Sequence, residues 1–117
     1  MNRTALFPGS FDPVTIGHVD IVNRSLSLFD NIVIGIGVNS SKKSLYSTEK
    51  RKEWLGKVFE DKEKVSVEQY EGLTVDFCNE IGAKFILRGL RTSADFEFER
   101  AIAQMNRSMH GDIETVF

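Results

Sequence analysis

The sequence has one cysteine, two histidines and two prolines among its 117 residues, and each low count excludes a kind of site or segment. One cysteine cannot form an internal disulfide, and Cys78 lies in a helical pattern, so we interpret it as a core thiol. One cysteine and two histidines are too few for a Cys/His zinc site within a single chain. Two prolines exclude a proline-rich linker.

An excess of charge of one sign is also lacking, because 15 lysines and arginines stand against 17 aspartates and glutamates. This balance creates no global positive field, so no nucleic-acid partner and no membrane partner is expected. The longest apolar stretch, residues 32–38, is too short to span a bilayer, and no signal-peptide pattern precedes Pro8. We therefore expect a cytoplasmic protein in which any bound anion is held by a local cluster of cations.

The composition is that of an ordinary globular domain, with 41% hydrophobic and 27% charged residues, and residues 1–117 are expected to form one domain. Strand patterns and helix patterns alternate along the chain. Strands are expected at 4–7, 32–38, 65–69, 84–87 and 113–117, and helical stripes at 19–29, about 48–59, 73–81 and 98–109. Five strands with intervening helices predict an α/β fold with a doubly wound, Rossmann-like parallel sheet.

Three residue types mark the expected ends of these helices. Ser47 is placed to cap the start of the second helix, and Gly82 to close the third. Thr92 or Ser93 is expected to cap the last helix. In the second helix, Trp54, Leu55 and Val58 are expected on the apolar side.

Residues able to bind a ligand or take part in catalysis follow the ends of the predicted strands, where doubly wound sheets bind their ligands. The segment 8–18 follows the first strand, and its glycines let the backbone approach a ligand closely. His18 falls in the first turn of the next helix, where the positive helix end favours a neutral, hydrogen-bonding imidazole. A lone histidine there is more often an ordinary surface residue, but its coincidence with the glycine-rich loop favours phosphate binding.

Cations follow two further strands. Lys42 lies in the polar loop after the second strand, where it is a plausible partner for a phosphate, although solvated lysines are common in such loops. Arg88 and Arg91 follow the fourth strand, and their guanidiniums are suited to bidentate contact with phosphate groups. Nearby carboxylates can pair with these arginines, or hold them in place for a ligand: Asp95, Glu97 and Glu99.

Two familiar nucleotide-binding motifs are absent from the sequence. The pair Gly35 and Gly37 lacks the third glycine of a dinucleotide fingerprint, because Ser40 stands there, and it lies inside a strand. No GxxxxGK[ST] sequence exists, so a P-loop is excluded. Phosphate binding is therefore expected from the first loop, the lysine and the arginines.

With these segments the chain resembles the bacterial phosphopantetheine adenylyltransferases, nucleotidylyltransferases with a TxGH motif. The resemblance covers nearly the whole chain and rests on residues 8–13, 15–18, 41–43, 72–77, 82–84, 88–91, 94–99 and 105–107. The GH element is shared with nicotinate-mononucleotide adenylyltransferases and cytidylyltransferases, which usually carry a histidine where Thr15 stands. The RGLR and DFEFE segments favour the phosphopantetheine family.

The resemblance implies transfer of AMP from ATP to 4′-phosphopantetheine, which gives dephospho-coenzyme A and pyrophosphate in coenzyme A biosynthesis. Catalysis is implied for His18, Lys42 and Arg91. ATP contacts are implied for Ser10, Phe11, His18, Gly89, Leu90, Arg91 and Glu99, and phosphopantetheine contacts for Ser10, Lys42, Thr74 and Arg88. The attacking phosphate has a second pKa of about 6, so in-line attack needs no general base, only alignment and electrostatic stabilisation.

The resemblance also implies a homohexamer, and Mg²⁺ bound through the ATP phosphates with no protein metal cluster. Family members continue past the equivalent of Phe117 into a Ser/Thr-rich loop and helix that close over ATP. The apolar strand pattern 113–117 breaks off without a turn signal. We therefore expect the C-terminal part of the domain to be missing, by truncation or by omission of a tail.

Two alternatives stay open. A nucleotide-binding or scaffold module of this fold would catalyse nothing. The joint presence of His18, Lys42, Arg88 and Arg91 argues against it, whereas the expected missing segment argues for it. Within the enzyme class, the alternative is adenylyl transfer to another phosphate monoester, which a comparison of acceptors distinguishes.

Overall fold

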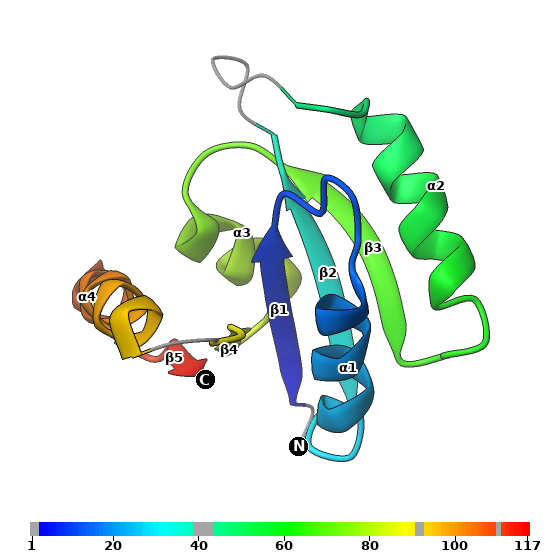
Figure 1. The fold of residues 1–117 in the computed structure, drawn as a ribbon. Coiled ribbons are helices and arrows are strands. Elements are labelled where there is room, and N and C mark those ends of the chain that lie inside the picture. Colours follow the sequence, from blue (N-terminus) through cyan, green and yellow to red (C-terminus); the bar gives the residue numbers. More distant parts are fainter. Residues whose placement is uncertain (1–2, 39–43, 91–92, 110) are drawn as a thin grey trace.

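The computed structural model describes residues 3–38, 44–90, 93–109 and 111–117, and along them strands and helices alternate. The elements are β1 (Thr4–Gly9), α1 (Ile16–Ser25), β2 (Asn31–Gly37), α2 (Thr48–Val58), β3 (Val65–Tyr70), α3 (Thr74–Ile81), β4 (Phe85–Leu87), α4 (Ser93–Met109) and β5 (Glu114–Val116). The strands form one parallel sheet in the order β3-β2-β1-β4-β5 (Figure 1). The predicted Rossmann-like α/β fold is confirmed.

Local signals placed most helix ends correctly. The hydroxyl of Ser47 accepts a hydrogen bond from the Lys50 N–H at 3.2 Å, as expected of an N-cap. Gly82 closes α3 with a φ of 74°, a left-handed conformation that suits glycine. The first helix is shorter than predicted: α1 ends at Ser25, and Phe29 enters the core from the turn before β2.

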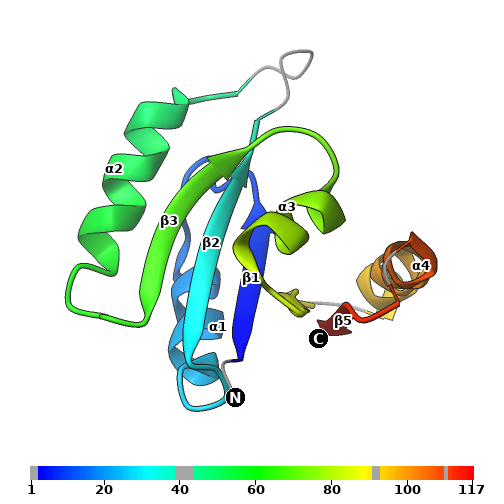
Figure 2. The same cartoon turned by 180° about the vertical axis from the view of Figure 1, so that it is seen from behind.

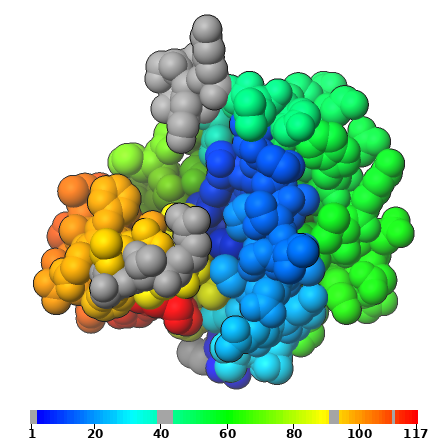
Figure 3. Space-filling view, in the orientation of Figure 1, coloured from blue at the N-terminus to red at the C-terminus, as the bar shows by residue number. Residues whose placement is uncertain are grey.

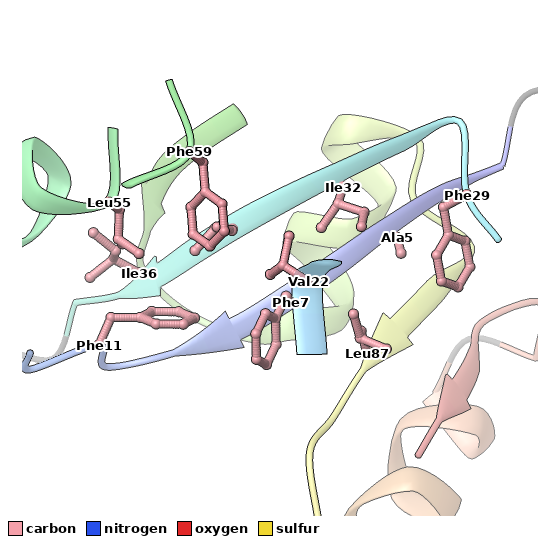
Figure 4. Packing of buried hydrophobic residues seen from close by; sticks show 11 residues of the cluster. Ala5, Phe7, Phe11, Val22, Phe29, Ile32, Ile36, Leu55, Phe59 and Leu87 are labelled. Carbon is pink, nitrogen blue, oxygen red and sulfur yellow. The ribbon is translucent and has the colours of Figure 1, made fainter. Parts of the chain in front are cut away.

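Helices cover both faces of the sheet, which explains why β2 is a continuous buried apolar strand (Figures 1 and 2). Helices α1 and α2 lie on one face, where Val22 and Leu55 join a core that includes alternate residues of β1 and β2 (Figure 4). Helix α3 lies on the other face, where Val75 and Cys78 pack near Leu6. The edge strand β3 alternates between half-buried and exposed residues over most of its length, as the sequence indicates.

The ladders of hydrogen-bonded strands are unequal in length. β1 pairs with β2 over six residues but with β4 over only two, Ala5 with Phe85 and Leu6 with Ile86. Beyond Leu6, therefore, β1 continues toward Gly9 without β4 beside it. This divergence lies where the strand order reverses, the usual ligand-binding position in such sheets.

Helix α4 lies beside β5, at the edge of the molecule (Figures 1 and 2). Its predicted apolar stripe is present, but Phe98 and Met105 are 67% and 63% exposed. Phe96 instead packs edge-on against Phe117, with ring centroids 5.3 Å apart. Within the described part of the chain, no helix combines the length and apolarity needed to cross a bilayer.

Candidate functional site

A cavity of about 530 Å³ opens at the carboxyl ends of β1 and β4. Its walls come from the β1–α1 turn, the end of β2, Ser44 and α2, the β3–α3 turn, β4 and the residue after it, α4, and β5. Figure 3 shows this side of the molecule, with α4 in orange and the segment after β1 in blue. The implied site residues that line the cavity are Ser10, Thr74, Arg88 and Glu99.

His18 is the third residue of α1 and forms a capping box with Thr15. The Thr15 backbone N–H donates to Nδ1 of His18 at 2.9 Å, and the His18 N–H donates to the Thr15 hydroxyl at 3.4 Å. Because Nδ1 accepts this bond, the ring proton of the neutral imidazole is on Nε2. Burial lowers the pKa of His18, and the positive charge of Arg88 lowers it further. His18 thus offers a neutral Nε2–H donor at the start of α1.

Phe11 supports this histidine rather than lining the cavity. Its ring is 2% exposed, lies 4.7 Å from the His18 ring, and meets Phe7 edge-on at 5.3 Å. Its backbone has a φ of 47°, so the β1–α1 turn bends sharply there. We therefore interpret the implied ATP contact of Phe11 as one that only its backbone could make.

Arg88 is held on two sides. Its Nε and Nη2 groups donate to the two carboxylate oxygens of Glu99 at 2.9 and 2.8 Å, and Nη1 donates to the Pro8 carbonyl at 2.7 Å. These bonds use three of the five N–H groups of a guanidinium, and the other two make no hydrogen bond to a residue that the structure describes. The expected pairing of Arg88 with a downstream carboxylate is confirmed for Glu99, which fixes Arg88 at the cavity wall, whereas its contact with a phosphate stays a prediction.

Thr74 lies at the start of α3 and shares a hydrogen bond with the Tyr70 hydroxyl at 3.0 Å. The Tyr70 ring stacks on Phe77, with centroids 4.6 Å apart and planes 4° from parallel. Burial raises the pKa of Tyr70, so its hydroxyl stays protonated at pH 7. One of the two O–H groups donates the bond that joins Tyr70 and Thr74. The other O–H group remains as a donor at the cavity wall.

Sequence reasoning missed two residues of this region, Asp12 and Arg51. Both line the cavity, and Arg51 is only 4% exposed. The expected apolar side of α2 was wrong in one respect, since Val58 is 42% exposed whereas Arg51 and Leu55 are buried. The spacing of four residues between Arg51 and Leu55 placed them on one helix face, but a charged residue is usually assigned to solvent.

The other site residues that the resemblance implies do not line the cavity or lie outside the described residues. Gly89 and Leu90 follow Arg88 as exposed residues that do not line the cavity. Lys42 and Arg91 lie outside the described residues.

In the described part of the chain, no three His, Cys, Asp or Glu side chains gather as metal ligands. Cys78 is buried and free, and burial raises its pKa to about 11, so the interpretation as a core thiol is confirmed.

Comparison with known proteins gives a consistent result. Residues 6–114 match the Cytidylyltransferase-like family model. The chain is 58% identical over 115 residues to phosphopantetheine adenylyltransferases of Flavobacterium psychrophilum and Flavobacterium johnsoniae; each match covers 98% of this chain, and 76% and 75% of those proteins. A bifunctional NMN adenylyltransferase/ADP ribose pyrophosphatase from Francisella tularensis shares the fold, with a TM-score of 0.74 at 16% identity, over 99% of this chain and 37% of that one.

Proposed function

Because the chain belongs to the phosphopantetheine adenylyltransferase family, we propose that it transfers the adenylyl group of ATP to the phosphate of 4′-phosphopantetheine. The products are dephospho-coenzyme A and pyrophosphate. The observation that carries the proposal is the identity of 58% with relatives of this name over 98% of the chain. The RGLR and DFEFE segments lie within that match.

The site supports this chemistry without a general base. The acceptor phosphate, with a second pKa of about 6, is largely a dianion at pH 7. One of its oxygens attacks the α-phosphorus of ATP, a new P–O bond forms, and the bond to the β-phosphate breaks as pyrophosphate leaves. The residues then have to align the two phosphates and stabilise the charge that grows on the α-phosphate oxygens.

His18 is the residue we assign to that stabilisation. Its neutral ring keeps a proton on Nε2, and it lies in the first turn of α1, where the positive end of the helix suits a phosphate. Two N–H groups of Arg88 that no described residue engages are assigned to the acceptor phosphate, and Ser10 and Thr74 line the same cavity. The substrate on the ATP side is the magnesium complex, in which the triphosphate holds the ion.

Further parts of the proposal rest on the resemblance alone. Lys42 is assigned to the acceptor phosphate and to catalysis, and Arg91 to ATP and to catalysis. Gly89, Leu90 and Glu99 are assigned to ATP. We propose a homohexamer that works in the cytoplasm, and light scattering coupled to size-exclusion chromatography tests the assembly.

A comparison of substrates tests the function. Purified protein is mixed with MgATP and one acceptor, either 4′-phosphopantetheine or nicotinate mononucleotide, and pyrophosphate release is followed. MgCTP replaces MgATP in a parallel series. We expect release with ATP and phosphopantetheine, and none above background with the other pairs. A preference for nicotinate mononucleotide or for CTP would overturn the assignment, and ATP binding without turnover would favour a scaffold module.

A further inference from the structure

Arg51 is a buried arginine with no carboxylate partner among the described residues. Arginine is rarely so buried unless it is paired, because an uncompensated buried charge lowers stability. The four hydrogen bonds that its side chain makes with described residues go to neutral oxygens of the backbone or of hydroxyl groups. The charge is therefore compensated by protein dipoles rather than by a counter-ion, which directs attention to what the guanidinium holds.

The guanidinium of Arg51 joins segments that are distant in sequence. Nη1 donates to the Ser10 carbonyl at 2.8 Å, in the turn that follows β1. Nη2 donates to the hydroxyls of Ser44 at 3.3 Å and Thr48 at 3.1 Å, and Nε donates to the Ser47 carbonyl at 3.4 Å. A planar fork of five donors can bridge several acceptors in this way, whereas an ammonium cannot reproduce the geometry.

Asp12 joins the same two regions in the opposite direction. Its carboxylate belongs to the β1–α1 turn and accepts backbone hydrogen bonds from Leu45 at 2.6 Å and Tyr46 at 2.8 Å. A carboxylate of the first turn thus holds the segment before α2, and a guanidinium of α2 holds the first turn. We call this reciprocal pair, Asp12 and Arg51, the turn clamp.

The turn clamp lies on the acceptor side of the site. Asp12 and Arg51 line the cavity together with Thr74 and Arg88, which the family resemblance assigns to phosphopantetheine. Of the other implied residues in the cavity wall, Ser10 is assigned to both substrates and Glu99 to ATP. His18 on the ATP side does not line it. Any shift of the Ser10 backbone would therefore change the wall against which the acceptor lies.

We propose that Asp12 and Arg51 are positioning residues for the acceptor, which act as one unit by fixing Ser10 against the segment 44–48. This inference rests on the proposed function. Displacement of about 1 Å in a positioning element is enough to misalign a bound group, so the clamp affects how the acceptor is held without touching the reacting atoms.

A double-mutant cycle tests joint action. Asp12→Asn removes the negative charge and keeps an acceptor for only one of the two backbone N–H groups, and Arg51→Lys keeps the charge but loses the fork. Each single change should raise the KM for phosphopantetheine about tenfold and the KM for ATP less than about twofold, the scale of one lost charge-assisted hydrogen bond. The double variant should resemble the worse single variant, because both changes release the same joint.

A second ion pair supplies the matched control. Asp20 and Arg24 lie 3.5 Å apart on α1, with side chains 58% and 80% exposed, so Asp20→Asn and Arg24→Lys should change neither KM. Melting temperatures of all variants without ligand separate a positioning role from a structural one. A lower melting temperature with both KM values unchanged would show that the clamp only supports the fold, and would overturn the inference.

The kinetic outcomes are also decisive. If the KM increases of the two single variants multiply in the double variant, joint action is refuted. If the KM values for ATP and phosphopantetheine rise equally, the acceptor-side assignment is refuted. If the unaltered protein turns over phosphopantetheine while the variants match it, the inference alone fails. If the unaltered protein does not use phosphopantetheine, the proposed function fails and the inference fails with it.

Discussion

Glu99 of α4 holds Arg88 at the end of β4 through two parallel hydrogen bonds of 2.9 and 2.8 Å. The pair is partly buried, with side chains 13% and 31% exposed. It ties α4 to the end of β4, whereas the apolar stripe of that helix is largely exposed. Glu99, assigned to ATP by resemblance, therefore also orients Arg88, which the same resemblance assigns to phosphopantetheine.

Glu99→Gln should lower the free energy of unfolding by about 1–3 kcal/mol, because it leaves the charge of Arg88 without its partner. The measurement is urea denaturation at pH 7. Glu97→Gln is the control, since Glu97 is 69% exposed and lies 3.9 Å from Arg100, an exposed pair of little value. Equal losses of unfolding free energy in the two variants would show that the Arg88–Glu99 pair stabilises the fold no more than an exposed ion pair does.

His18→Ala should lower kcat by about 10²–10³, the usual cost of removing one donor that acts on the transition state. The KM for ATP should change little, since the lost bond strengthens only as charge grows on the α-phosphate. Steady-state pyrophosphate release measures both. His18→Gln, which keeps a side chain able to complete the capping box, separates the chemistry from the helix start. An unchanged kcat with a raised KM would make His18 a binding residue only.

The neutral state of His18 should be visible in a pH titration. Burial and Arg88 both lower its pKa in the folded protein, so its imidazole resonances should titrate below the usual value of about 6.5 in NMR spectra. Arg88→Gln should raise this pKa only part of the way, because burial is the larger cause. His110→Gln identifies the signal of the second histidine. A titration at or above the usual value would contradict the neutral donor.

Stability should follow the same titration with a definite sign. Between the lowered pKa of folded His18 and the higher pKa of the unfolded chain, the unfolded state binds more protons. The contribution of His18 to stability is therefore complete above the unfolded pKa, and it falls as the pH decreases toward the folded one. Urea denaturation of the protein and of His18→Gln across this range should show a smaller acid-side loss in the variant.

Two glycine substitutions should change stability in opposite directions. A Cβ on Gly35 in β2 would lie 2.8 Å from Cδ1 of Leu6 and 3.0 Å from Cε1 of Tyr70, so Gly35→Ala overpacks the sheet. We expect a loss of about 1–3 kcal/mol. A methyl group on Gly56 in α2 would meet no atom within 4 Å, so Gly56→Ala should add about 0.5–1 kcal/mol. Thermal denaturation measures both stability changes, and two changes in the same direction would contradict the packing argument.

The order of elements was predictable because each strand carries its own apolar run and each helix its own stripe or cap. Ser47 and Gly82 act locally, so their roles could be inferred from neighbouring residues. Arg51 could not be found in this way, because its burial depends on Ser10, which lies 41 positions earlier in the chain. The choice of Glu99 over other carboxylates as the partner of Arg88 likewise depends on how α4 is placed.

The site residues show the same division. Residues carried over through a motif, such as His18 and Arg88, fell at the predicted sheet edge because strand ends are encoded locally. The separation of Phe11 from the cavity was not foreseeable, because an aromatic residue in a glycine-rich loop can face either a ligand or the core. Its ring faces Phe7 and His18, and only the three-dimensional packing shows this choice.

The unequal ladders of the sheet divide the backbone into a tightly joined half and a loosely joined half. β1, β2 and β3 are paired over six residues at each junction, whereas β4 is paired over two residues with β1 and three with β5. Local opening of β4, β5 and α4 breaks fewer backbone bonds, so their amide hydrogens should exchange with solvent sooner than those of β2. Ser10 stands on one side of this divide and Arg88 on the other, so an acceptor that contacts both adds a bridge that the sheet itself lacks.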